Sequence, residues 1–174
     1  MKQEAYNDFI NTTNELIQLL SSLSQEQLNQ VPFEGSWTAG QVGDHLRRSY
    51  GVAELLNGNT ITTERPPNEK VKGIKEVFLN FDIKFESPEF ILPSNDVIDK
   101  ERLIKGLTNK IEQVKTFVDM HDDLTRTCID FELPGAGTLT QIEWIQFMTI
   151  HTQRHIRQLK NIIAKLNVSE NVRG

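Results

Sequence analysis

The chain has 174 residues, including four histidines and one cysteine, and carries a formal net charge of -5 at pH 7. This length suits a single domain over residues 1–174 that can bury a core without disulfide bonds. Lys and Arg are scattered through the chain, which excludes a nucleic-acid partner, and no apolar stretch is long enough to cross a bilayer. Because no apolar leader follows Met1, we expect a cytoplasmic protein that binds no membrane.

The first half of the chain predicts two amphipathic helices. Apolar residues recur at spacings of three and four between residues 3 and 29, which predicts the first helix. Thr38 and Gln41 form a Thr-x-x-Gln capping box, which predicts that a second helix begins there and runs to the Asn-Gly-Asn breaker at 57–59. His45 lies two turns into this second helix.

A long connection separates these helices from two more. Residues 58–93 hold four prolines and four phenylalanines, so the segment is too long for a turn and too apolar for disorder. We expect an ordered crossover there, containing a short helix or a strand pair. The helical period returns over 95–120, and a second capping box at Thr138 and Gln141 predicts a last helix that ends near residue 166.

These elements predict an all-α fold, namely a four-helix bundle with a long crossover between the second and third helices. Bundles of this kind commonly hold metal ions in the core between facing helices. The sole cysteine, Cys128, leaves no disulfide or dithiol motif, and we expect a buried, inert thiol.

The last predicted helix carries a histidine pair. His151 and His155 are four residues apart, so both imidazoles leave the same side of the helix, one turn from each other, and can chelate one divalent metal ion. Trp144 and Met148 share this face, which indicates that it points inward. Taken alone, the pair is equally compatible with core histidines that are hydrogen-bonded to carbonyl groups and water.

His45 would supply a third imidazole if the second and last helices are neighbours. Three neutral imidazoles leave coordination positions open for water, which is the pattern of a catalytic site rather than a structural one. His121 is the alternative ligand, but the three aspartates near it indicate a surface position. We therefore predict that the metal ligands are His45, His151 and His155.

No protein group can be named as general base. In a His-Glu-x-x-His metalloprotease the glutamate beside the first ligand takes that role, whereas Thr152 occupies the place here. The carboxylates of Asp44 and Glu143 fall off the histidine face by helical phase. A metal-bound water with a lowered pKa could itself act as the base or the nucleophile.

Three segments together are similar to a known family. They read Ser-Trp-Thr-Ala-Gly-Gln-Val-Gly-Asp-His-Leu at 36–46, Leu-Thr-Gln-Ile-Glu-Trp at 139–144 and His-Thr-Gln-Arg-His at 151–155. Their order resembles the DinB / YfiT-like superfamily, from the first helix to the last, with the weakest similarity in the crossover. One departure is Leu133-Pro134, where many relatives carry His-Pro.

The resemblance implies a four-helix bundle, often dimeric, whose three metal-binding histidines map onto His45, His151 and His155. The metal would be zinc, nickel, iron or manganese, and imidazole ligands do not choose among them. It further implies an enzyme that transfers a low-molecular-weight thiol or hydrolyses a small-molecule substrate, and we expect a homodimer. The alternative is a non-catalytic metal- or ligand-binding module related to stress.

Four arginines flank the histidines in the sequence, and two interpretations of them stay open. They either hold an acidic thiol cosubstrate at the mouth of a pocket or form solvated helix faces. These residues are Arg47, Arg48, Arg154 and Arg157.

Overall fold

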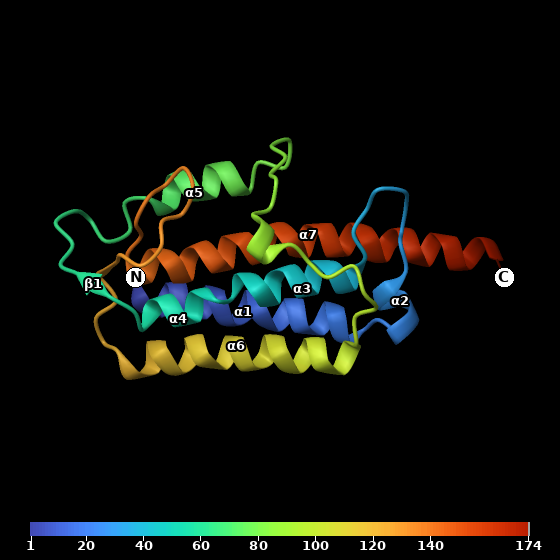
Figure 1. The fold of residues 1–174 in the computed structure, drawn as a ribbon, viewed down its shortest axis with the longest axis horizontal. Helices are drawn as coiled ribbons and strands as arrows, with labels where there is room; N and C mark the ends of the chain where they lie inside the picture. The colour runs from blue at the N-terminus through green and yellow to red at the C-terminus, as the bar shows by residue number, and fades with distance from the viewer. Residues whose placement is uncertain (174) are drawn as a thin grey trace.

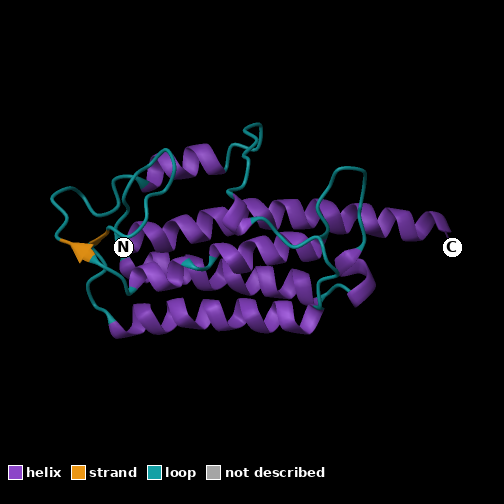
Figure 2. Cartoon of the chain, in the orientation of Figure 1, coloured by secondary structure: helices purple, strands orange, loops and turns teal. Residues whose placement is uncertain are grey.

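The computed structural model describes the backbone of residues 1–173 and the side chains of residues 1–168. It confirms the all-α prediction: four rows of helix run side by side (Figures 1 and 2). The helices are α1 (Lys2–Ser21), α2 (Gln25–Asn29), α3 (Ala39–Ser49), α4 (Val52–Leu56), α5 (Val71–Phe78), α6 (Lys100–Met120) and α7 (Gln141–Arg173).

The first predicted helix is interrupted, so the prediction of one helix over 3–29 is wrong. Ser24 forms a capping box that starts α2: its Oγ accepts a hydrogen bond from the Gln27 amide at 3.1 Å, and its own amide donates to Gln27 Oε1 at 3.0 Å. The continuous apolar periodicity hid this break, because buried leucines, Leu20, Leu23 and Leu28, continue through it.

The second predicted helix begins where the capping box placed it. The Gln41 amide donates to Thr38 Oγ1 at 3.1 Å, and the Thr38 amide donates to Gln41 Oε1 at 3.0 Å. The helix is divided near Gly51 into α3 and α4, which continue along one row of the bundle (Figure 1). The division leaves His45 in the longer piece, α3.

The two later helices begin at different residues from those predicted. α6 starts at Lys100 and not near residue 95, because the Asp99 side chain accepts the Arg102 amide at 2.8 Å and caps the helix there. α7 starts at Gln141, but its cap lies two residues later than the predicted Thr138 box and pairs Thr140 with Glu143. α7 also continues beyond residue 166, to Arg173.

The core explains why α3 lies beside α7. Each of the four rows contributes a leucine with no exposed surface, namely Leu16, Leu46, Leu107 and Leu159. α3 packs against both α6 and α7, and α1 packs against α7. Gly43 lies at the close approach of α3 to α6, where an added Cβ atom would lie 2.7 Å from Leu103 Cδ2 and would displace that side chain. This packing turns His45 toward α7.

The crossover is ordered, as predicted, and contains both a helix and a strand. β1 (Thr60–Ile61) pairs antiparallel with β2 (Thr127–Cys128), and Cys128 is buried, as expected. α5 packs on α7 and lies outside the four rows (Figure 1), and a 3-10 turn at Glu89–Ile91 contacts α3. Among the described helices, none is both long and apolar enough to span a membrane.

Candidate metal centre

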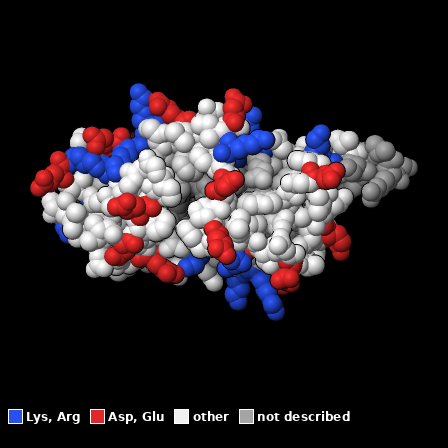
Figure 3. All heavy atoms as spheres, turned by 45° about the horizontal axis from the view of Figure 1, so that its top comes forward, with Lys and Arg blue, Asp and Glu red and all other residues white. Residues whose placement is uncertain are grey.

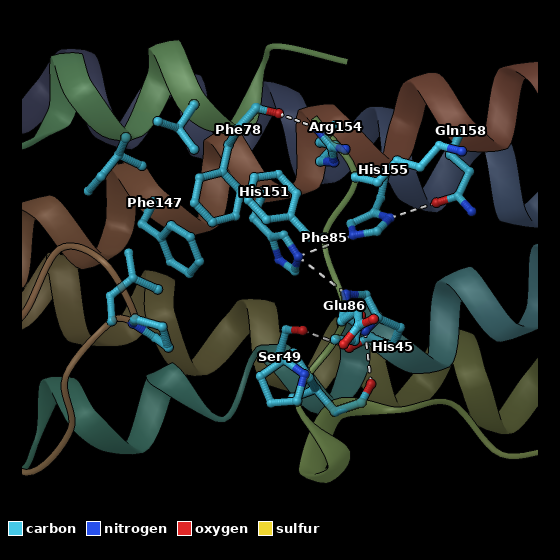
Figure 4. A pocket seen from close by; sticks show the side chains of 18 of the residues that line it. His45, Ser49, Phe78, Phe85, Glu86, Phe147, His151, Arg154, His155 and Gln158 are labelled. Atoms are coloured by element: carbon cyan, nitrogen blue, oxygen red, sulfur yellow. Dashed lines mark hydrogen bonds between the residues drawn. The ribbon is translucent and has the colours of Figure 1, made fainter. Parts of the chain in front are cut away.

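Three histidines from two helices meet at one point. His151 Nε2 lies 3.2 Å from His45 Nε2 and 3.1 Å from His155 Nε2 (Figure 4). One ring nitrogen of each histidine lies within 4.8 Å of those of the other two. The structure thus brings together all three residues that the sequence proposed as ligands.

Two of the rings are held in a fixed orientation by oxygen acceptors. His45 Nδ1 donates to the Ile91 carbonyl at 2.8 Å, and His155 Nδ1 donates to Gln158 Oε1 at 2.8 Å. Since Nδ1 carries the proton in both rings, each Nε2 keeps a free lone pair that faces the other histidines. This arrangement of outer hydrogen bonds is the one that metal-binding imidazoles require.

The surroundings keep the three imidazoles neutral. Burial lowers the pKa of His45, and burial together with the neighbouring histidines lowers the pKa of His151 well below its usual value. Burial, with a contribution from His45, lowers the pKa of His155 to about 3. Neutral imidazole is the form that binds a metal ion, so the site is ready for one near neutral pH.

Two of the three nitrogen–nitrogen separations are close to those around a tetrahedral ion, and the third lies within 4.8 Å. Zn–N bonds of about 2.0–2.1 Å at tetrahedral angles separate two ligand nitrogens by roughly 3.3 Å, close to the 3.1 and 3.2 Å found here. Within the described side chains, no further histidine, cysteine or carboxylate joins the three. A bound ion would therefore keep at least one position for water or substrate.

Two other residues considered from the sequence lie away from this centre. Thr152, which occupies the place of the metalloprotease glutamate, is fully buried, and its Oγ1 lies 2.8 Å from the Tyr50 hydroxyl. His121 is exposed; it stacks on Phe117 with ring centroids 4.1 Å apart and donates from Nδ1 to the Phe117 carbonyl.

The carboxylate of Asp44 is committed to ion pairs. It accepts hydrogen bonds from Arg47 at 2.7 Å, from Arg48 at 2.9 Å and from the Ser94 amide at 3.0 Å. Burial opposes ionisation, but these donors outweigh it and hold the pKa of Asp44 below its usual value. Arg47 and Arg48 do not line the cavity described below, and they are partly exposed ion-pair partners of Asp44.

Glu143 is the most buried carboxylate of the described chain and binds the crossover. Its side chain has no exposed surface and forms two hydrogen bonds with Arg65, at 2.7 and 2.6 Å. It also accepts the backbone amides of Lys70 and Thr140, each at 2.9 Å. Its helical phase takes it off the histidine face, and it anchors residues 65–70 to the start of α7.

A cavity of about 1510 Å³ opens on the histidines. Aromatic rings form much of its wall: Phe147 stacks on His151 at 5.6 Å between centroids, and Phe78 meets the same imidazole edge-on at 6.2 Å. This wall was not predicted from the sequence. The spacing of Val71, Ile74 and Phe78 at the positions of one helix face is the signal that could have found α5 and placed Phe78 inward.

Arg154 holds the crossover over the cavity. Its guanidinium donates to the carbonyls of Phe78 at 2.8 Å, Asn80 at 3.2 Å and Ile83 at 2.6 Å, and it lies 4.7 Å from the Phe85 ring centroid. These donors are consumed within the protein. Arg154 is thus neither part of a solvated helix face nor free to bind an acidic cosubstrate, the two roles considered from the sequence. Its role is structural, because it holds the crossover against α7.

Comparisons with known proteins agree with this architecture. The chain is 28% identical to the uncharacterized protein YuaE of Bacillus subtilis (strain 168) over 153 residues, which cover 84% of this chain and 90% of that protein. It superposes with a TM-score of 0.60 on YfiT from Bacillus subtilis, at 16% identity, over 95% of this chain and 87% of YfiT. YfiT is described as a probable metal-dependent hydrolase with an unusual four-helix bundle topology.

The family model of the DinB superfamily matches residues 8–159, which include all three histidines and the crossover between them. The chain therefore belongs to the DinB superfamily.

Proposed function

We propose that the protein is a metal-dependent hydrolase of a small molecule, with a divalent ion held by His45, His151 and His155. The observation that carries the proposal is the convergence of three lone-pair nitrogens at the wall of a cavity large enough for a substrate. The structural similarity to YfiT, itself described as a probable metal-dependent hydrolase, supports it.

The residues of the chain would bind the ion, orient the imidazoles and exclude water from the site. When bound, the divalent ion would supply Lewis acidity, which polarises an acyl or phosphoryl oxygen and activates water near neutral pH. Gln158 and the Ile91 carbonyl keep the imidazoles oriented. The rings of Phe78 and Phe147 remove solvent from one side of the histidines, which strengthens electrostatic effects at the reacting atoms.

Glu86 is our candidate for the proton acceptor. Two carboxylates line the cavity, and one of them, Glu69, lies 3.8 Å from Arg65. Glu86 has neither an ion pair nor a hydrogen bond among the described side chains, and it points into the cavity in Figure 4. In hydrolysis, water would add to the acyl carbon, and the Glu86 carboxylate would take the water proton and return it to the leaving group.

Metal removal is the first test of the proposed function. We expect purified protein to contain an ion per chain by elemental analysis, and a chelator to abolish hydrolysis of p-nitrophenyl ester and phosphate probes. Addition of zinc, nickel, iron or manganese should restore hydrolysis. Metal binding with no turnover of ester, amide or thiol-transfer probes would instead favour a binding module, and consumption of free thiol would favour a transferase.

Replacement of Glu86 tests the proton acceptor. Glu86→Gln removes the basic oxygen at nearly constant size, so we expect the rate constant for probe hydrolysis to fall by about 10²–10⁴-fold with unchanged metal content. Glu69→Gln is the matched control on the same cavity and should change the rate little. Equal rates for wild type and Glu86→Gln across the pH range would remove Glu86 from the mechanism.

A further inference from the structure

We propose that the cavity binds a small molecule that combines an aromatic ring with an anionic group, the ring lying among the crossover phenylalanines and the anion at Arg157. This inference rests on the proposed function in one respect, since it takes the cavity beside the histidines as the substrate site. The binding step itself requires neither turnover nor a metal ion.

The aromatic wall favours a planar ligand. Phe78 stacks on Phe85 with ring centroids 4.9 Å apart and an interplanar angle of 13°, and it meets Phe147 edge-on at 5.2 Å. Further along the crossover, Phe85 and Phe81 leave 43% and 38% of their surface exposed. Large apolar rings grouped around a cavity mark a binding surface, and an inserted aromatic ring would gain both burial and stacking.

Arg157 presents a free cation on this wall. Its Cζ lies 3.8 Å from the centroid of the Phe81 ring, so one face of the guanidinium is covered while its N–H edges stay open. Arg157 has no hydrogen-bond acceptor or ion-pair partner among the side chains up to residue 168, in contrast to Arg154, which binds three carbonyls. Planar guanidinium groups bind carboxylate, sulfonate and phosphate oxygens through paired N–H donors.

The charge around the cavity also favours an anion. Four cationic side chains line it, against the carboxylates of Glu69 and Glu86, although the whole chain carries a net charge of -5. Figure 3 shows that positive and negative groups are interspersed over the face it displays, so the surplus is local. The four cations are Lys70, Lys84, Arg154 and Arg157. A local positive surplus in an acidic protein concentrates anionic ligands at that site.

The position of Arg157 separates the two ends of the ligand. It follows His155 by two residues on α7, which is about 3 Å along the helix axis and roughly 200° around it. A continuous series of ring contacts connects it to the histidines, from Phe81 and Arg154 through Phe85 and Phe78 to His151. A ring lying along this series would place its anionic group at Arg157 and its remaining substituent toward the histidines.

Calorimetric titration with matched probes tests the inference. The probes are naphthalene-2-sulfonate, the neutral methyl 2-naphthyl sulfone, and methanesulfonate, which lacks the ring. Sulfonate is a poor metal ligand, and each titration is run on metal-loaded and on chelator-treated protein, so that binding at the arginine is distinguished from binding at a metal. We expect naphthalene-2-sulfonate to bind about tenfold more tightly than the sulfone in both forms, and methanesulfonate not to bind.

The variants then assign the anion to one residue. Arg157→Gln should bring the two naphthyl probes to equal affinity with metal content unchanged, whereas Arg102→Gln, the same charge change on the exposed face of α6, should preserve the tenfold difference. Equal affinity of the two probes for wild type, absence of binding, or an undiminished difference in Arg157→Gln would each overturn the inference. If the wild-type protein binds no metal ion, that result would overturn only the proposed hydrolase.

Discussion

His151→Ala and His155→Ala are each expected to abolish tight metal binding while the bundle stays helical. Each replacement removes one of three nitrogens that converge within 4.8 Å, and two imidazoles cannot enclose an ion as three do. Changes to groups that only orient metal ligands cost about 10–100-fold in affinity, so loss of a ligand should cost more than about 100-fold. Alanine keeps the helix, because it has the highest helix propensity. Elemental analysis and metal titration measure the loss, and circular dichroism measures helicity.

His45→Ala should give the same loss, since its ring meets His151 from α3. His121→Ala is the matched control: it removes an exposed imidazole whose Nδ1 binds only a backbone carbonyl, and the metal content should not change. Full metal content in His45→Gln together with loss in His121→Ala would show that the third ligand has been misassigned. If all three ligand variants bind as many metal ions per chain as wild type, the assignment of the metal site is wrong.

Glu143→Ala is expected to lower the free energy of unfolding by about 3 kcal/mol, because it leaves a partly buried Arg65 and two backbone amides without their acceptor. For a chain of this length the melting temperature should fall by roughly 6–12 °C. Glu112→Ala, which removes an exposed partner of Lys115, should change the free energy of unfolding by less than about 0.5 kcal/mol. A Glu143→Ala protein as stable as wild type would show that the crossover needs no anchor at α7.

The same glutamate should make stability depend on pH. Burial opposes its ionisation, but hydrogen bonds from Arg65 and from the amides of Thr140 and Lys70 outweigh burial and lower its pKa below the ordinary 4.5. In acid the unfolded chain therefore takes up this proton before the folded chain does. The stabilisation is fully present above about pH 5 and is lost as the pH falls through the lowered pKa. Melting curves of wild type and Glu143→Ala should therefore converge in acid.

The histidine cluster could be predicted because helical periodicity is a local property. A spacing of four fixes the relation of His151 to His155 without any knowledge of the fold, and apolar Trp144 and Met148 fix the direction of the face. Both of these side chains are buried in the structure. The place of His45 needed one tertiary assumption, that its helix neighbours the last one, which holds for α3 and α7.

What the sequence did not reveal depends on contacts between distant segments. The bond between Glu143 and Arg65 spans 78 residues, and no local pattern pairs them. The shift of the α7 cap from Thr138 to Thr140 follows from the same network, because Glu143 completes the box with Thr140 while the Thr138 carbonyl accepts from Lys70. The cavity wall was equally hidden, since it forms only when Arg154 draws the carbonyls of the crossover onto α7.

The division of the three histidines between α3 and α7 has a consequence for folding. An ion bound to all three would join residues 45 and 151 and close a loop of the chain, much as a covalent cross-link does. An unfolded chain that kept this ion bound would have less conformational freedom than one without it. The folded bundle holds the imidazoles together in advance, so the ion binds it in preference to the unfolded chain. At a free metal concentration 1,000 times its dissociation constant, this preference would add about 4.1 kcal/mol to the stability of the bundle. Metal supply would then govern how much folded protein persists, independently of any reaction at the site.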